Sequence, residues 1–128
     1  MIHFLLVDVD IELAKQAGAK KAMPLAVSVP CHSDLMKSAS EELASSLNQT
    51  EIKTPTIPVI NNVDAAIELN ADAIRQKLIT QLYSPVLWVA SINQMVGMGI
   101  TQTVECGPGK VLQGLVKKIE STAEARSI

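Results

Sequence analysis

The segment at residues 24–37, PLAVSVPCHSDLMK, constrains the fold of this chain more than any other. Apolar residues alternate with small ones over residues 25–29, which predicts a buried strand, and Pro30 ends strand pairing. A helical pattern opens directly afterwards. A strand that turns at once into a helix is typical of α/β folds, where such corners hold side chains rigidly at the rim of the sheet. We therefore expect an α/β protein, with His32 at the corner as a candidate catalytic residue.

A single histidine has two interpretations. His32 is either a general base or an ordinary hydrogen-bonded structural histidine, because imidazole serves both roles near neutral pH. A base needs a partner that holds its second ring nitrogen. Asp34 lies two residues away, but at the start of the helical pattern its better role is a favourable charge on the helix dipole.

The rest of the chain alternates between strand-like and helical patterns. Together with residues 25–29, an apolar run at 2–9 and a helical stretch at 11–17 predict a β-α-β unit. The next helix is indicated by Leu35, Ala39, Leu43 and Leu47, which recur every four residues. We expect a proline-punctuated strand at 54–60, a turn at Asn61-Asn62, helices at 71–82 and 86–98, a strand at 101–106, a helix at 111–119 and a frayed tail from Ser121. In the helix at 111–119 the inward-facing residues are predicted to be Val111, Leu112, Leu115, Val116 and Ile119.

Composition bounds the class of protein. The 128 residues are 48% hydrophobic and 19% charged, so the chain can bury a core, but aromatics are only 2% and the core must be aliphatic. A net charge of -2 gives no basic face for a nucleic acid. The two cysteines form no disulfide framework, no leader pattern is present, and no apolar run is long enough to cross a membrane. We expect a cytoplasmic protein with no nucleic-acid or membrane partner.

Four motifs occur in a fixed order: SVPCHSDLM (28–36), TPTIPVINNVD (54–64), AIRQKLITQLYSPVLW (73–88) and VECGPGKVLQGLVKKI (104–119). Together they make residues 14–119 resemble the carboxy-terminal part of bacterial malonyl-CoA:acyl carrier protein transacylases. The resemblance implies transfer of malonyl from coenzyme A to acyl carrier protein in fatty acid biosynthesis, through an acyl-serine intermediate and with no cofactor beyond the thioester substrate. It places His32 on the catalytic base and Gln81 on the glutamine beside it, where a neutral carbonyl acceptor orients the imidazole.

The family's nucleophile is a serine in a Gly-His-Ser-x-Gly-Glu elbow, and that sequence does not occur here. The resemblance therefore implies a carboxy-terminal fragment that is inactive alone, because a base without its nucleophile gives almost no covalent catalysis. By the same comparison, residues 1–30 are a remnant of the ferredoxin-like subdomain, with 1–10 possibly non-native. Residues 31–120 are part of the α/β-hydrolase-like acyltransferase core, and 121–128 are the frayed tail.

Other patterns give weaker hypotheses. Asp8 and Asp10 after an apolar run are similar to the acidic pair of phosphotransferases, although the expected Gly-Thr is missing. A non-catalytic interaction module that exposes a sheet edge is a further alternative. The Gly107-Pro108-Gly109 turn is either structural or an anion cradle. Less favoured readings are a Cys31 nucleophile, a metal site at the histidines and cysteines, and a carrier-protein contact at Lys20, Lys21, Lys117 and Lys118.

Overall fold

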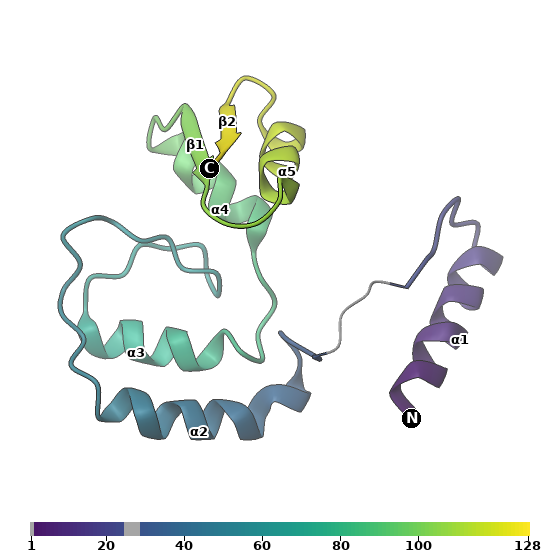
Figure 1. The fold of residues 1–128 in the computed structure, drawn as a ribbon, viewed down its shortest axis with the longest axis horizontal. Coiled ribbons are helices and arrows are strands. Elements are labelled where there is room, and N and C mark those ends of the chain that lie inside the picture. Colours follow the sequence, from purple (N-terminus) through teal and green to yellow (C-terminus); the bar gives the residue numbers. More distant parts are fainter. Residues whose placement is uncertain (1, 25–28) are drawn as a thin grey trace. The chain divides into compact units, whose positions relative to one another are not determined.

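The computed structural model describes residues 2–24 and 29–128, and it divides into two compact units, Met1–Pro30 and Cys31–Ile128. The described elements are α1 (Ile2–Gln16), a short 3-10 helix η1 (Asp34–Met36), α2 (Lys37–Asn48), α3 (Ala71–Thr80), α4 (Trp88–Gly97), β1 (Gln102–Glu105), α5 (Val111–Ile119) and β2 (Glu124–Ser127) (Figure 1). This mixture of helices and a parallel strand pair confirms the α/β prediction.

The first unit contains a helix where the sequence predicted a strand. Residues 2–9 belong to α1, so the predicted β-α-β unit is wrong in its first strand, and the helical stretch that begins at Ile11 is the second half of the same helix. A continuous apolar run does not distinguish a strand from a helix, and no glycine or proline interrupts this one before Gly18. Gly18 has a φ of +94°, and this left-handed residue ends the helix. The second predicted strand falls mainly on residues 25–28, outside the described part of the chain.

In the second unit, α2 and α3 lie side by side (Figure 1). The half-buried side chains of Ala39, Leu43 and Leu47 lie along α2, as their spacing predicted, while Leu35 in η1 is exposed. The two helices run antiparallel, because Arg75 near the start of α3 donates hydrogen bonds to the carbonyl of Leu47 in the last turn of α2 and to that of Thr50 just after it. The carboxyl end of α3 consequently lies near the segment that contains His32.

The predicted strand at 54–60 is wrong. Among the described residues this segment forms only an isolated antiparallel bridge, between Ile60 and Ile67. Pro55 and Pro58 remove two of the backbone donors that a ladder requires, so extended backbone here does not become a paired strand. The turn predicted at Asn61-Asn62 is present and extends to Asp64.

The core of the second unit lies where α4 and α5 meet the β1–β2 pair. Its buried residues are Ile92, Val116, Ala123 and Ala125, with Trp88, Met95 and Ile119 packed against them. The two strands are parallel, in a register that pairs Gln102 with Glu124, and α5 is the connection between them. A two-stranded sheet covers one side of α5 only. Val116 and Ile119 therefore face inward as predicted, whereas Val111, Leu112 and Leu115 are exposed, which corrects that part of the prediction.

The prediction of a frayed tail from Ser121 is also wrong. Residues Glu124–Ser127 form β2, and the preceding Ala123 is buried together with Ala125. The alternation of small apolar and charged residues in AEAR is a period-two strand pattern, although it is too short and too polar to stand out in the sequence.

Candidate active site around His32

His32 lies in the turn between Pro30 and η1, with an unusual backbone conformation. Its φ is +62°, a left-handed value that few non-glycine residues adopt. The conformation is supported by its backbone N–H, which donates a 2.8 Å hydrogen bond to the carbonyl of Leu82, directly beyond α3. The side chain is exposed, so the imidazole is accessible to a reacting group.

The imidazole is oriented by two backbone carbonyls. Its Nδ1 lies 2.9 Å from the carbonyl oxygen of Gln81 and 3.1 Å from that of Ser84. Carbonyl oxygens only accept hydrogen bonds, so Nδ1 carries the proton and donates it to both. In the neutral ring this leaves Nε2 as the unprotonated nitrogen, which is the arrangement a general base requires.

The carbonyls that orient His32 belong to the turn that follows α3. This turn continues the helical hydrogen-bonding pattern for three residues: Gln81 N–H donates to Lys77, Leu82 N–H to Ile79, and Tyr83 N–H to Thr80. Pro85 prevents the helix from continuing through Ser84. The structure thus brings together the two residues singled out from the sequence, His32 and Gln81, through the main-chain oxygen of Gln81.

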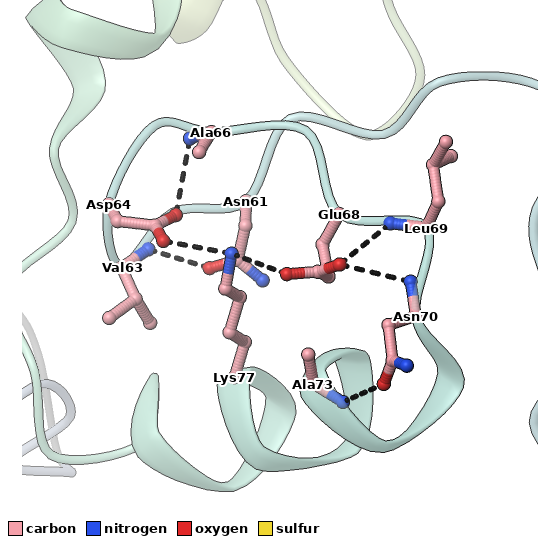
Figure 2. Close-up of polar contacts among 9 residues, drawn as sticks. All are labelled: Asn61, Val63, Asp64, Ala66, Glu68, Leu69, Asn70, Ala73 and Lys77. Carbon is pink, nitrogen blue, oxygen red and sulfur yellow. Dashed lines mark hydrogen bonds and ion pairs between the residues drawn. The ribbon is translucent and has the colours of Figure 1, made fainter.

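A loop at residues 61–70 packs along α3 and is held by internal hydrogen bonds (Figure 2). Asn61 Oδ1 accepts from Val63 N–H at 2.8 Å, and Asn70 caps α3 by accepting from Ala73 N–H at 2.9 Å. Lys77 of α3 reaches into the loop between Asp64 and Glu68, at 2.8 Å and 3.3 Å from their oxygens. We call these three residues the Lys77 cluster.

The charges of the Lys77 cluster stabilise one another. The hydrogen bond from Lys77 lowers the pKa of Asp64 below its usual 3.8. Glu68 has its pKa lowered below 4.5, first by the N–H of Asn70 and then by Leu69 and Lys77. The hydrogen bond with Asp64, followed by that with Glu68, raises the pKa of Lys77 above 10.5. All three groups are therefore charged over the whole neutral range.

Asp34 and the two cysteines do not take the roles that the sequence suggested for them beside His32. The carboxylate of Asp34 pairs with Lys37 at 3.0 Å and is 82% exposed, whereas two carbonyls hold the imidazole, so Asp34 is not the orienting group. Both cysteines, Cys31 and Cys106, are free and exposed. Among residues 2–24 and 29–128 no group of three or more His, Cys, Asp or Glu side chains is arranged to hold a metal ion.

The glycine turn at 107–109 leads into α5, whose amino terminus is already occupied. Glu105 accepts hydrogen bonds from the N–H groups of Leu112 and Gln113, at 3.2 Å and 2.9 Å. A carboxylate of the chain itself thus fills the position that an anion would take in a phosphate cradle. This arrangement favours the structural interpretation of the turn.

The phosphotransferase hypothesis required Asp8 to follow a strand. Asp8 and Asp10 instead lie within α1. Successive helical residues diverge around the axis, so the pair lacks the strand-end geometry on which the hypothesis depended. We therefore drop this alternative. In the described part of the chain no helix is long and apolar enough to cross a membrane.

Comparisons with known proteins give a consistent result. No family model matches the chain. It is 50% identical over 114 residues to the malonyl CoA-acyl carrier protein transacylase of Escherichia coli (strain K12), and 51% identical over 113 residues to that of Bacillus subtilis (strain 168). These alignments cover 89% and 88% of this chain but 37% and 36% of the two relatives. The chain is homologous to the carboxy-terminal part of the malonyl transacylases.

Solved transacylase structures share its fold. An acyl carrier protein S-malonyltransferase from Vibrio cholerae aligns with a TM-score of 0.88 at 49% identity, over 95% of this chain and 40% of that one. A malonyl-transacylase solved in complex with its type II PKS acyl-carrier protein aligns with a TM-score of 0.89 at 47% identity, again over 95% of this chain and 40% of that one. The chain therefore spans about two fifths of the transacylases that it matches.

Sequence reasoning missed three contributors to this site. The carbonyls of Leu82 and Ser84 were not anticipated, because backbone acceptors leave no residue-type signal. The Ser84-Pro85 pair, which predicts a turn after the helix, was the available indication. The ion pairs of Lys77 could not be inferred, since the loop at 61–70 had no predicted path.

Proposed function

We propose that this chain provides the histidine base of a malonyl-CoA:acyl carrier protein malonyltransferase of fatty acid biosynthesis. The observation that carries the proposal is the orientation of His32, whose Nδ1 donates to Gln81 and Ser84 and whose Nε2 is left to accept a proton. This arrangement occurs in a chain that is half identical to transacylases over most of its length. A neutral acceptor suits thioester exchange, because a thiolate leaving group needs less acid assistance than an amine.

In the proposed reaction, Nε2 of His32 takes the proton of a serine hydroxyl in the part of the enzyme that this chain does not contain. The serine oxygen attacks the malonyl thioester carbonyl, the carbon–sulfur bond breaks, and the proton passes to the departing coenzyme A thiolate. Nε2 then removes the proton of the phosphopantetheine thiol of acyl carrier protein. That sulfur attacks the acyl-serine ester, and the serine oxygen leaves and regains the proton.

Gln81 enters the proposal as a positioning residue that acts through its main-chain carbonyl. The proposal needs no cofactor beyond the thioester substrate, and it assigns the enzyme to the cytoplasm, where the free thiols of Cys31 and Cys106 would stay reduced. It also assigns residues 1–30 to a remnant of the ferredoxin-like subdomain and residues 31–120 to the acyltransferase core.

The test joins this chain to the amino-terminal part of the Escherichia coli relative, in place of the homologous carboxy-terminal part. The isolated chain should transfer no labelled malonyl above background, and the folded chimera should transfer it. Replacing His32 with Asn in the chimera should lower the rate by about 10²–10⁴-fold, the usual contribution of a general base. Asparagine tolerates a left-handed φ, so this variant removes the base and leaves the turn intact.

Two outcomes contradict the proposal. One is stable, stoichiometric acylation of the isolated chain by malonyl-CoA. The other is a His32→Asn chimera with circular dichroism and transfer rate equal to those of the unchanged chimera.

A further inference from the structure

The Lys77 cluster joins α3 to the loop at 61–70, and its side chains are less exposed than those of the other ion pairs among the described residues. The side chain of Lys77 is only 19% exposed, and Asp64 and Glu68 are 43% and 26% exposed. Figure 2 shows the ammonium group between the two carboxylates. Partial burial between two partners reduces both the screening and the side-chain freedom that weaken isolated surface pairs.

Each carboxylate in this cluster divides its two oxygens between the loop and the lysine. Asp64 accepts from Ala66 N–H with Oδ1 and contacts Lys77 with Oδ2. Glu68 accepts from the N–H groups of Leu69 and Asn70 with Oε1 and contacts Lys77 with Oε2. Each carboxylate is therefore held by the loop backbone through one oxygen and contacts Lys77 through the other, so the lysine joins the loop to α3.

The turn that orients His32 is attached at both of its ends, to Lys77 at one end and to the loop at 61–70 at the other. On one side, the carbonyl of Lys77 accepts the N–H of Gln81 at 3.0 Å, and the carbonyl of Gln81 accepts Nδ1–H of His32. On the other side, Leu87 N–H donates to the carbonyl of Asn62 at 3.0 Å. The segment between these two attachments contains both carbonyls that hold the imidazole.

We propose that Lys77 is a positioning residue for the base: by joining α3 to the loop at 61–70, it holds the carbonyls of Gln81 and Ser84 where they keep the proton of His32 on Nδ1. The inference rests on the proposed function for its catalytic meaning. The claim that Lys77 keeps the proton of His32 on Nδ1 can be tested without that function, because the tautomer of His32 can be observed in this chain alone.

The test measures the tautomer of His32 by ¹⁵N chemical shifts of the ring nitrogens at about pH 8, where the Lys77 cluster is fully charged. A His3→Gln variant assigns the signals, since the chain has two histidines. In the unchanged chain the Nδ1–H form should dominate. In Lys77→Met, which keeps the length of the side chain and removes its charge, that dominance should be lost. Lys77→Arg keeps the positive charge between the two carboxylates and should retain it.

A matched control and a second variant keep the outcome clear. Lys15→Met removes an exposed ion pair with Glu12 on α1 and should leave the His32 tautomer unchanged. Glu68→Gln should weaken the Nδ1–H preference by itself, and in combination with Lys77→Met it should add nothing, because both changes break the same connection. Circular dichroism verifies that each variant is folded.

The inference is overturned if the folded Lys77→Met and Glu68→Gln variants both retain the Nδ1–H tautomer at the original population. That result would leave the proposed function standing, since His32 would still present Nε2 as a base. Conversely, an inactive chimera together with a lysine-dependent tautomer would count against the function and support the positioning role.

Discussion

At the scale of single residues, the main chain orients the candidate base. Three carbonyls from one turn receive hydrogen bonds from His32, two from its ring and one from its backbone N–H. Backbone acceptors do not depend on the identity of the side chain that carries them. The turn geometry, rather than the amide of Gln81, therefore determines the direction of the imidazole.

This difference gives a prediction for Gln81. Replacing it with alanine keeps the carbonyl and the good helix-forming character of the position, so the His32 tautomer should be unchanged and the transfer rate of the chimera should fall by less than about tenfold. The comparison is with His32→Asn, for which a loss of about 10²–10⁴-fold is expected. If Gln81→Ala equals His32→Asn in its loss of rate, the amide side chain itself takes part in the reaction.

At the scale of elements, α3 and the loop at 61–70 form one structural unit with the turn at 81–84. The loop supplies an N-cap to α3 through Asn70 and two carboxylates to Lys77, and it binds the segment before α4 through Asn62. The cluster depends on ionised groups, so its contribution to the free energy of unfolding changes with pH.

The pH dependence has a defined sign. Asp64 and Glu68 have lowered pKa values in the folded chain, so their contribution is complete above the ordinary values of 3.8 and 4.5 and is lost as pH falls through the lowered ones. Lys77 has a raised pKa, so its contribution is complete below 10.5 and is lost as pH rises through the raised value. Between those limits the contribution should be constant.

Thermal melts of the unchanged chain and Lys77→Met test this dependence. The difference in Tm should be constant from about pH 6 to 9 and should disappear as the carboxylates are protonated below about pH 4. Lys15→Met, whose ion pair is exposed, should show little difference at any pH. A Lys77→Met difference that stays constant down to about pH 2 would mean that lost packing of the lysine stem, and no ion pair, causes the destabilisation.

Elements with a clear period were predictable from the sequence, and those that depend on distant partners were not. The helix predicted at 111–119 matches α5 residue for residue, since its apolar spacing and the glycine turn before it are local signals. The run at 2–9 has apolar content without a diagnostic period, so the strand that it predicts is wrong and the segment is helical. β2 exists because its backbone pairs with β1 some twenty residues earlier, and no local propensity encodes that pairing.

The candidate site likewise contains residues that could be predicted from the sequence and features that could not. His32 and Gln81 could be singled out because a resemblance to a family attaches roles to residue types in motifs. The resemblance also implies a neutral carbonyl acceptor near Gln81. The carbonyls of Leu82 and Ser84, the left-handed φ of His32 and the Lys77 cluster arise from the path of the chain between motifs, which residue types do not encode.

At the scale of the whole molecule, the chain consists of two compact units, and the core and candidate site both belong to the second, Cys31–Ile128. Many large apolar side chains of this unit are exposed, among them Ile57, Val59, Val89, Val104, Val111 and Leu112. Parallel sheets are normally covered on both faces, and the solved transacylases are more than twice as long as this chain. Such exposed apolar side chains are expected when a chain contains only part of the hydrophobic core of a larger protein.

The division into two units predicts the behaviour of a shortened chain. A chain of residues 29–128 retains every contact described for the core and for His32, so we expect it to melt cooperatively. Its Tm should lie within about 4 °C of that of the full chain, which corresponds to a change of less than about 1 kcal/mol in the free energy of unfolding. Calorimetry of both chains at equal concentration measures this. Loss of the cooperative transition on shortening would show that residues 1–28 are needed to fold the second unit.

The left-handed backbone at position 32 has an evolutionary consequence. Besides histidine, glycine, asparagine and aspartate adopt such a φ most readily, and none of them has a side chain whose ordinary pKa lies near 7. Glycine or asparagine at this position should therefore be compatible with the turn while removing the proposed base. A homologue that carries asparagine or glycine here would be expected to keep this turn and to lack the imidazole.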